Sequence, residues 1–376
     1  MKNFLSEDDI EIAVIKVLGN QALPWRTLNC FTSNADDLND GSNRSDKSKV
    51  VFEDILKDRL ILLNPDIPIE GIEQALSKLT RGRRAMSLIN ANIEVYNDLR
   101  NGIQVNYDDA SGKETFATVK VIDFNDATTN DFLAVQQLWI KGEIGYRRPD
   151  VILYVNGLPL VFIELKNNTV SVKNAYKDNL ATYKRELPQL FWYNAVTILS
   201  NGKETRLGSF TAPWEHFGEW LRIEDEKERP DKKSIVKSGV SLKYTVNGLC
   251  KHNKLLDYIE SFIMYHNSAY KICAKNHQFI GVNKVVDSFE NRVIQNGKLG
   301  VFWHTQGSGK SYSMVFFTRK VFRKFEGNFT FLVITDRTDL NTQIYRNFVD
   351  MGACKEADTS LPSNSSELRD VLLVGR

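Results

Sequence analysis

Residues 145–167 read GYRRPDVILYVNGLPLVFIELKN, and this stretch decides the fold that we predict for the first part of the chain. Its two apolar runs, VILYV and LVFI, flank Asn156-Gly157, a pair typical of the tight turn of a β-hairpin. Both runs are apolar on both faces, which predicts strands covered on two sides. Charges are costly in such strands. Asp150, Glu164 and Lys166 lie there nevertheless, and are therefore candidates for a functional site.

The spacing of these three residues predicts one shared surface. Glu164 and Lys166 are two residues apart, so a strand projects both from the same face, and the hairpin can bring Asp150 opposite them. Two neighbouring carboxylates repel each other unless a divalent cation lies between them. Mg²⁺ suits this place because it binds carboxylates, waters and a substrate phosphate. A lysine beside it can orient or deprotonate the attacking water, which indicates phosphodiester hydrolysis.

A simpler interpretation of the same residues remains open. Asp150 can cap a strand, and Glu164 and Lys166 can form an ion pair on a solvated face, as most charges on strands do. The apolar residues that flank them favour the functional interpretation.

Composition limits the kind of protein. A chain of 376 residues predicts roughly two or three domains. Its 49 Lys and Arg against 47 Asp and Glu give a net charge of +2, which neither requires nor excludes a nucleic-acid partner. The four cysteines form no CxxC pair, which disfavours a disulfide framework and a zinc site and favours a reducing cytoplasm. No apolar run approaches the roughly 18 residues of a membrane span, so we expect no membrane association.

Periodicity predicts helices first and then a mixed sheet in the amino-terminal part. Ser6 and Asp9 form a predicted capping box at the start of an amphipathic helix, and the polar residues 32–49 are predicted to be a surface loop. Later periodicities predict helices at 50–64, 68–80, 85–100 and 175–187, a strand meander at 103–109, 114–124 and 132–142 with a turn at 109–113, and a strand at 194–202.

A change of pattern predicts the domain organisation. Residues 224–241 are dense in charge and predict a connector, and residues 255–272 predict an apolar bridging helix. From residue 278 onward helix and strand patterns alternate, which predicts a parallel α/β sheet. We therefore expect domains at 1–245 and 276–376, joined by a bridging helix at 246–275.

The second candidate site lies in KLGVFWHTQGSGKSYSMVFFTRKVF, residues 298–322. A strand, a glycine-containing turn and a helix follow one another in the order of a phosphate-binding loop, although His304 stands where the full Walker A pattern has its first glycine. Lys310 can reach the β- and γ-phosphates, and Ser311 can ligate Mg²⁺. The predicted nucleotide-binding residues are Gln278, Thr305, Gly307, Ser308, Gly309, Lys310 and Ser311. An ordinary surface glutamine is the alternative for Gln278.

Together these motifs resemble the restriction (motor) subunit of type I restriction-modification enzymes. Pro149-Asp150 followed by Glu164-Leu165-Lys166 resembles the PD-(D/E)xK nuclease core, and HTQGSGKS followed by VITDRTDLNTQ resembles the start of a superfamily 2 helicase. The resemblance implies a restriction-endonuclease-like mixed sheet flanked by helices, then the start of a RecA-like domain. In that setting Asp336 belongs to an element that contacts nucleic acid rather than to a Walker B motif.

The resemblance also implies site residues and cofactors. Its catalytic set is Asp150, Glu164, Lys166, Glu73 and Tyr183, with Glu70 as the alternative to Glu73, and its metal ligands are Asp150, Glu164 and Leu165. Tyr183 matches the tyrosine of the family's QxxxY element, and Asn179 stands in place of the glutamine. The implied cofactors are Mg²⁺ and ATP.

The resemblance finally implies a function and partners. The protein would cleave double-stranded DNA and translocate it with ATP, together with methyltransferase and specificity subunits. The sequence ends before any second acidic motif of a motor, so we expect an amino-terminal portion that does not translocate alone. The alternatives are a non-nuclease P-loop ATPase and a DNA-binding assembly module with a degenerate nuclease-like platform.

Overall fold

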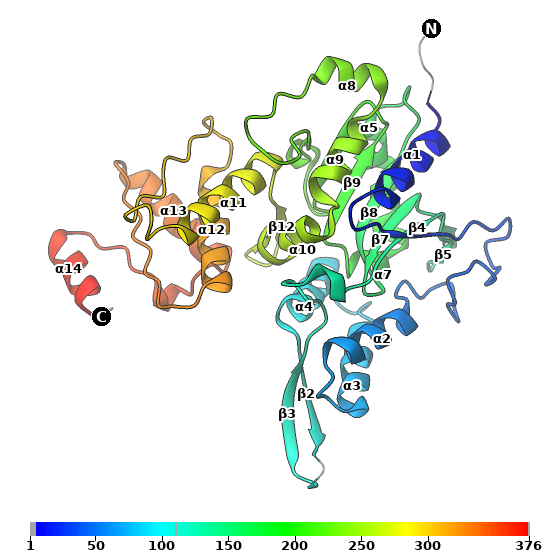
Figure 1. The fold of residues 1–376 in the computed structure, drawn as a ribbon, viewed down its shortest axis with the longest axis horizontal. Helices are drawn as coiled ribbons and strands as arrows, with labels where there is room; N and C mark the ends of the chain where they lie inside the picture. The colour runs from blue at the N-terminus through cyan, green and yellow to red at the C-terminus, as the bar shows by residue number, and fades with distance from the viewer. Residues whose placement is uncertain (1–4, 110, 375–376) are drawn as a thin grey trace. The chain divides into compact units, whose positions relative to one another are not determined.

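The computed structural model describes residues 5–109 and 111–374, and the chain forms two compact units, Met1–Glu260 and Ser261–Arg376. The division falls inside the range 246–275 that we predicted to be a bridging helix. Figure 1 shows the course of the chain, and each unit is described by itself.

A mixed six-stranded sheet forms the centre of the first unit, in the order β1-β4-β7-β8-β9-β10. β1 is parallel to β4 and β8 is parallel to β9, whereas the other neighbours are antiparallel. All residues of β7, β8 and β9 are buried, as expected for strands covered on both faces. The strand bounds are β1 Arg26–Asn29, β4 Phe132–Gln136, β7 Val151–Val155, β8 Leu158–Leu165, β9 Val196–Ser200 and β10 Thr205–Gly208.

The predicted hairpin is present as β7 and β8, joined by Asn156 and Gly157. Both turn residues have positive φ, 51° and 79°, which is the conformation that an Asn-Gly turn adopts at low cost. A Cβ atom on Gly157 would lie 2.5 Å from the carbonyl oxygen of Phe52, so the close approach of the chain before α2 also requires glycine.

Helices of the first unit pack around this sheet. α1 packs against α9, β1 and β8, and its predicted Ser6–Asp9 capping box is present. The helix bounds are α1 Glu7–Gly19, α2 Glu53–Leu63, α3 Ile69–Thr80, α4 Leu88–Asn101, η1 Ala127–Thr129, α5 Val172–Asn174, η2 Ala175–Leu180, α6 Ala181–Glu186, α7 Pro188–Phe191, η3 Trp214–His216, α8 Lys232–Ser238, α9 Ser241–Leu249 and α10 His252–Ser261.

The predicted strand meander is only partly correct. β2 (Ile103–Asp108) and β3 (Glu114–Val119) pair only with each other among the described residues, and this hairpin projects away from the central sheet in Figure 1. β5 (Ile140–Lys141) and β6 (Tyr146–Arg147) form another small sheet. α3 packs on β2 and β3, so Ile103, Val105 and Val119 are buried without joining the central sheet, whereas Phe116 of β3 stays 70% exposed. Ala110, in the predicted turn, lies outside the described residues.

Residues 32–49 are irregular, as predicted, but they are not simply a surface loop. Asp40, Arg44 and Lys47 are buried, and Asp40 Oδ2 lies 3.0 Å from Arg44 Nη2 and 2.8 Å from Lys47 Nζ. A buried carboxylate is tolerated when cations and hydrogen bonds surround it. Some of the polar residues of this stretch therefore form a buried ion cluster. Composition alone cannot distinguish such buried polar residues from polar residues exposed to solvent.

The predicted bridging helix is wrong. α9 and α10 cover the first part of this range, and a hairpin of β11 (Ile263–His266) and β12 (Tyr270–Cys273) follows. Asn267 and Ser268 have positive φ and form the turn. A short apolar run does not by itself distinguish a helix from a strand. Here the turn at Asn267 and Ser268 favours a hairpin.

Three long helices dominate the second unit, and the expected parallel sheet is not formed by its described residues. The stretches predicted as strands, around 299–303 and 329–335, have no ladder partner among those residues, and Val301 and Ile334 are 94% and 83% exposed. A strand in a parallel sheet needs hydrogen-bonded neighbours and cover on both faces. The helical elements are α11 Asn276–Glu290, α12 Lys310–Lys324, α13 Thr338–Asp350, η4 Glu356–Asp358 and α14 Ser365–Val374.

Candidate active site

The fold brings Asp150, Glu164 and Lys166 together. Pairing of Val151 with Ile163 places Asp150, just before β7, beside the end of β8. The amide N–H of Leu165 donates to Asp150 Oδ2 at 2.7 Å. Lys166 Nζ lies 3.3 Å from Glu164 Oε1 and donates to the Leu165 carbonyl oxygen at 2.7 Å. Two carboxylates, one ammonium and one main-chain carbonyl therefore share one end of the hairpin.

Burial dominates the electrostatics of this cluster. Glu164 is 2% exposed, and burial together with the nearby Asp150 charge raises its pKa well above the usual value, against the opposing effect of Lys166. Burial raises the pKa of Asp150 to about 7, although the Leu165 hydrogen bond and Lys166 act to lower it. The two carboxyl groups, Asp150 and Glu164, are therefore stabilised by binding a proton or a cation.

The donor set suits a small hard cation that keeps part of its water shell. Glu164 Oε2 is buried without a hydrogen-bond partner, and the Leu165 carbonyl accepts from the same Lys166 ammonium that pairs with Glu164 Oε1. Within the part of the chain that the structure describes, no group of three or more His, Cys, Asp or Glu side chains is arranged to hold a metal. Mg²⁺ commonly needs only one or two protein carboxylates, so Asp150, Glu164 and Leu165 fit it.

A further acid near the cluster comes from α1 and was not predicted. Glu11 is buried, and its two carboxylate oxygens accept hydrogen bonds from the side-chain amides of Gln136 and Gln137. Burial raises the pKa of Glu11, and the negative charges of Glu11 and Glu7 in turn raise the pKa of Asp150. One signal in the sequence could have identified it, because Glu11 lies beside Ile10 on the buried face of an amphipathic helix.

The upstream acids that we predicted lie elsewhere. Glu73 has a side chain that is 59% exposed and forms an ion pair with Lys57 of α2 at 3.2 Å. Glu70 is exposed on the same helix, α3. Neither acid is among the charges that shift the pKa of Asp150, whereas Glu11 and Glu7 are. The structure therefore brings neither Glu70 nor Glu73 to the cluster.

Tyr183 and Asn179 both lie beside the cluster. The Tyr183 hydroxyl donates to the Arg148 carbonyl oxygen at 3.2 Å, and its ring packs edge-on against Phe162. Burial, followed by the Glu164 and Asp150 charges, raises the pKa of Tyr183 well above its usual value. Asn179 Nδ2 donates to Glu164 Oε1. Asn179 comes from η2, a π-helical turn, a feature found often at functional sites.

The predicted nucleotide-binding residues gather in the second unit around the start of α12. Gly307 and Gly309 have positive φ, 73° and 85°, and Lys310 is the first residue of the helix. Lys310 Nζ donates to the carbonyl oxygens of His304 and Thr305 at 2.9 and 3.1 Å.

Gln278 packs on this loop rather than on the surface. It is buried, its amide nitrogen donates to the Gly309 carbonyl at 3.0 Å, and its amide oxygen accepts the Lys275 N–H. Ser308 contributes a buried hydroxyl without a hydrogen-bond partner, and Ser311 follows Lys310 in the first turn of α12. The alternative of an ordinary surface glutamine does not describe Gln278.

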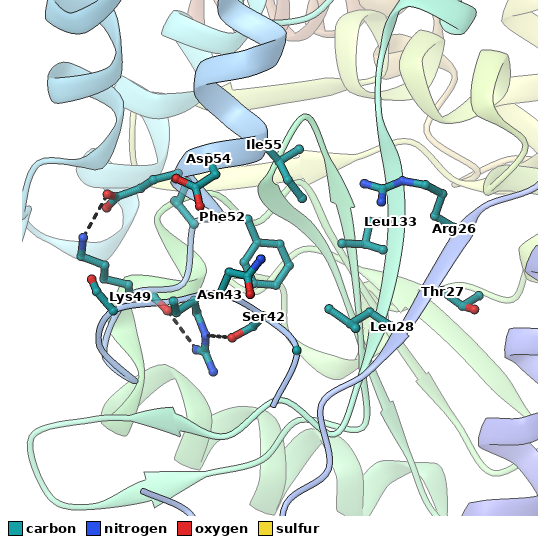
Figure 2. Close-up of a pocket in the computed structure, with 15 residues that line it drawn as sticks. Arg26, Thr27, Leu28, Ser42, Asn43, Lys49, Phe52, Asp54, Ile55 and Leu133 are labelled. Atoms are coloured by element: carbon teal, nitrogen blue, oxygen red, sulfur yellow. Dashed lines mark hydrogen bonds and ion pairs between the residues drawn. The ribbon is translucent and has the colours of Figure 1, made fainter. Parts of the chain in front are cut away.

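The first unit also contains a cavity of about 410 Å³, and Figure 2 shows the residues that line it. β1, β4, residues 41–45 and the start of α2 line it, with Leu28, Leu133, Phe52 and Ile55 as apolar walls. Its charged lining residues are already paired in part, Lys49 with Glu53 and Arg26 with Asp131. Asp150, Glu164 and Lys166 do not line it, so cavity volume does not locate the carboxylate cluster.

Comparison with known proteins defines the class of this chain. The family model described as "Type I restriction enzyme R protein N terminus" matches residues 4–216, and the chain belongs to this family. A second model, described as "SWI2/SNF2 ATPase", matches residues 277–375. The family resemblance inferred from the sequence is therefore confirmed. No described helix is long and apolar enough to cross a membrane.

Among similar proteins are the HindI endonuclease subunit of Haemophilus influenzae and a putative MjaIXP endonuclease subunit of Methanocaldococcus jannaschii, both named as type I restriction enzyme subunits. The first is 36% identical over 92% of this chain and 33% of its own length. The second is 32% identical over 67% of this chain and 26% of its own length. The chain thus spans about a third or less of the length of these relatives.

Proposed function

We propose that the chain is the nuclease-bearing part of a type I restriction enzyme endonuclease subunit, and that its first unit hydrolyses phosphodiester bonds of double-stranded DNA with Mg²⁺. The observation that carries this proposal is the convergence of Asp150, Glu164 and Lys166 at one end of a buried hairpin. We further propose that the mixed sheet has the PD-(D/E)xK fold, because the acid and the Glu-x-Lys segment lie on adjoining strands followed by helix.

Each residue of the cluster has a proposed task. Asp150, Glu164 and the Leu165 carbonyl would hold Mg²⁺, which when bound would supply Lewis-acid stabilisation of the phosphate charge. Lys166 Nζ would orient or deprotonate the attacking water. Asn179 would act as a positioning residue through its bond to Glu164, and Tyr183 through its bond to the main chain at Arg148.

Glu11 takes the place of Glu73 as the upstream acid in this proposal. Its carboxylate is buried near Asp150, and two glutamine amides fix its orientation. A preorganised acid at this position can bind a water of the metal shell without a free-energy cost for reorienting its side chain during the reaction.

The second unit would bind ATP through Lys310, Ser311 and the loop that precedes them, with Gln278 beside the loop. The match to an ATPase family supports this part. ATP-driven DNA translocation, and assembly with methyltransferase and specificity subunits, are proposed for the longer protein to which the curated relatives correspond.

Mg²⁺-dependent cleavage of plasmid DNA tests the nuclease proposal. We expect Lys166→Met and Asp150→Asn to reduce the rate at least about 100-fold, the typical effect of removing a positioned acid–base or charge-stabilising group. Glu11→Gln should reduce cleavage by about 10-fold or more, whereas the matched change Glu73→Gln should leave it unchanged. The assay measures nicked and linear products over time, with and without ATP. A wild-type chain that cleaves no DNA and binds no divalent ion would refute the nuclease assignment.

A further inference from the structure

Arg148, two residues before Asp150, is held between two aromatic rings. Its guanidinium carbon lies 4.9 Å from the centre of the Phe31 ring and 4.9 Å from that of Trp139. Trp139 Nε1 donates to the Thr32 carbonyl at 3.0 Å, which ties the two aromatic segments together. The Tyr183 hydroxyl donates to the carbonyl oxygen of Arg148 itself. Side chain and main chain of this arginine are therefore both fixed.

Among the residues that the structure describes, no carboxylate forms an ion pair with this guanidinium and no acceptor forms a hydrogen bond with it. The neighbouring Arg147 is different, because its Nη2 lies 2.6 Å from Glu186 Oε2. Aromatic rings cover the faces of a guanidinium by cation–π contact, and its N–H donors point outward in the plane. Arg148 thus keeps its charge and its planar set of donors available for an anion.

The position of Arg148 connects it to the carboxylate cluster. Its positive charge acts to lower the pKa of Glu11 and of Tyr183, so it lies within electrostatic reach of both. Phe31 is 56% exposed and Arg148 is half-buried, so the aromatic pair opens to solvent on one side. A large ligand can therefore reach this arginine from solvent, and Asp150, two residues further along the chain, is also only partly buried.

We propose that Arg148 binds a backbone phosphate of the DNA strand that enters the candidate active site, beside the phosphodiester bond that is hydrolysed. This inference rests on the proposed nuclease function and adds a substrate contact to it. An arginine suits the task because its planar donors match two phosphate oxygens, and the two rings hold it in place before DNA arrives.

Salt-dependent DNA binding tests this contact. The affinity of the 376-residue chain for a labelled duplex is measured by fluorescence anisotropy in Ca²⁺ between 50 and 200 mM salt, roughly the range over which phosphate contacts dominate. Arg148→Met keeps an apolar side chain between the rings but removes the donors. We expect about 10-fold weaker binding and a salt slope smaller by about 0.9, the value for one lost phosphate contact.

Matched variants separate this role from a structural one. Arg147→Met should keep the wild-type slope because Glu186 already neutralises Arg147. Arg148→Lys should keep the slope but bind more weakly than wild type, since a lysine offers a point charge without the planar donors. Thermal unfolding of each variant is measured alongside, and Arg148→Met should unfold within a few degrees of wild type.

Two negative outcomes have different meanings. A wild-type chain that binds and cleaves DNA, with Arg148→Met showing the same affinity and slope, overturns the phosphate contact and leaves the nuclease function intact. The phosphate contact is also overturned if Arg148→Met and Arg148→Lys both bind DNA more weakly only in proportion to their loss of folded protein. In that case the salt slope of the remaining folded protein equals that of wild type. A wild-type chain that neither binds nor cleaves DNA overturns the proposed function itself.

Discussion

At the scale of single residues, the cluster keeps two acids where water does little to stabilise their charge. Asp150 and Glu164 both have raised pKa values, and burial is the main cause. Gln137, which holds Glu11, has a φ of 55°, a left-handed conformation that costs a non-glycine residue about 1 kcal/mol or more. These costs are typical of sites where geometry serves binding rather than stability.

Asp150→Asn should therefore stabilise the metal-free protein while removing activity. The pKa of Asp150 rises from 3.8 to about 7 on folding, so the folded state binds the proton more tightly, and the stability from this group is lost as pH rises through 7. We expect the gain in unfolding free energy of Asp150→Asn over wild type to be about 2–3 kcal/mol larger at pH 8 than at pH 5.

Urea unfolding in EDTA at the two pH values measures this difference. Asp66→Asn, at an exposed position outside the cluster, is the control for the loss of one surface carboxylate. Equal effects of Asp150→Asn at pH 5 and pH 8 would contradict the electrostatic account of the cluster.

At the scale of elements, strand register and one π-helical turn build the site. The pairing of β7 with β8 brings Asp150 to Glu164, and a one-residue slip would send each side chain to the opposite face. The π-helical turn η2 presents Asn179 to Glu164, and Tyr183 follows one turn later on α6. Residues 32–49 are stabilised in another way. They form no helix or strand, and their buried ion cluster holds the segment in place instead of a regular ladder of backbone hydrogen bonds.

Asp40→Asn should destabilise the first unit strongly. It would leave Arg44 and Lys47 buried without their carboxylate, a loss of about 3–5 kcal/mol. Burial acts to raise the pKa of Asp40, but bonds from Lys47 and Ser42 and the Arg44 charge outweigh it and hold this pKa at about 2. The stability from this group is present above pH 3.8 and is lost as pH falls towards 2.

Thermal and urea unfolding check this expectation. Asp37→Asn in the same segment, where the carboxylate accepts bonds from its neighbour Asn39, is the control and should change stability by less than about 1 kcal/mol. A fully stable Asp40→Asn variant would show that the cluster contributes little.

At the scale of the whole molecule, the two units carry separate candidate sites. The carboxylate cluster lies in Met1–Glu260 and the phosphate-loop residues lie in Ser261–Arg376. Substitutions at one site at a time therefore test the two proposed activities separately.

Lys310→Ala should remove nucleotide binding without unfolding the chain, because Lys310 is exposed and its bonds are to two loop carbonyls. ATP with Mg²⁺ at about 100 times its Kd should stabilise the wild type by about 2.7 kcal/mol. We expect Lys310→Ala to show no such gain and Lys166→Met to keep it, as measured by thermal unfolding with and without ATP. A gain retained by Lys310→Ala would place the nucleotide elsewhere.

The sequence by itself determined the features that depend on neighbours in the chain. The β7–β8 hairpin, its Asn-Gly turn, the spacing of Glu164 and Lys166, and the helix after the glycine loop all follow from local patterns. The family resemblance rested on the same short motifs, because catalytic chemistry places particular residue types at fixed local spacings.

Only the tertiary structure decided which distant segments meet. Glu11 reaches the Asp150 region because α1 packs on β1 and β8, and Arg148 is held by rings from two segments that are far from each other in the sequence. The apolar run after Leu255 became a helix and a hairpin, and the expected strands of the second unit found no partners among its described residues. Local patterns specify the propensity for helix or strand and the face on which each side chain lies. Long-range packing and hydrogen bonding decide which side chains are buried and which strands pair.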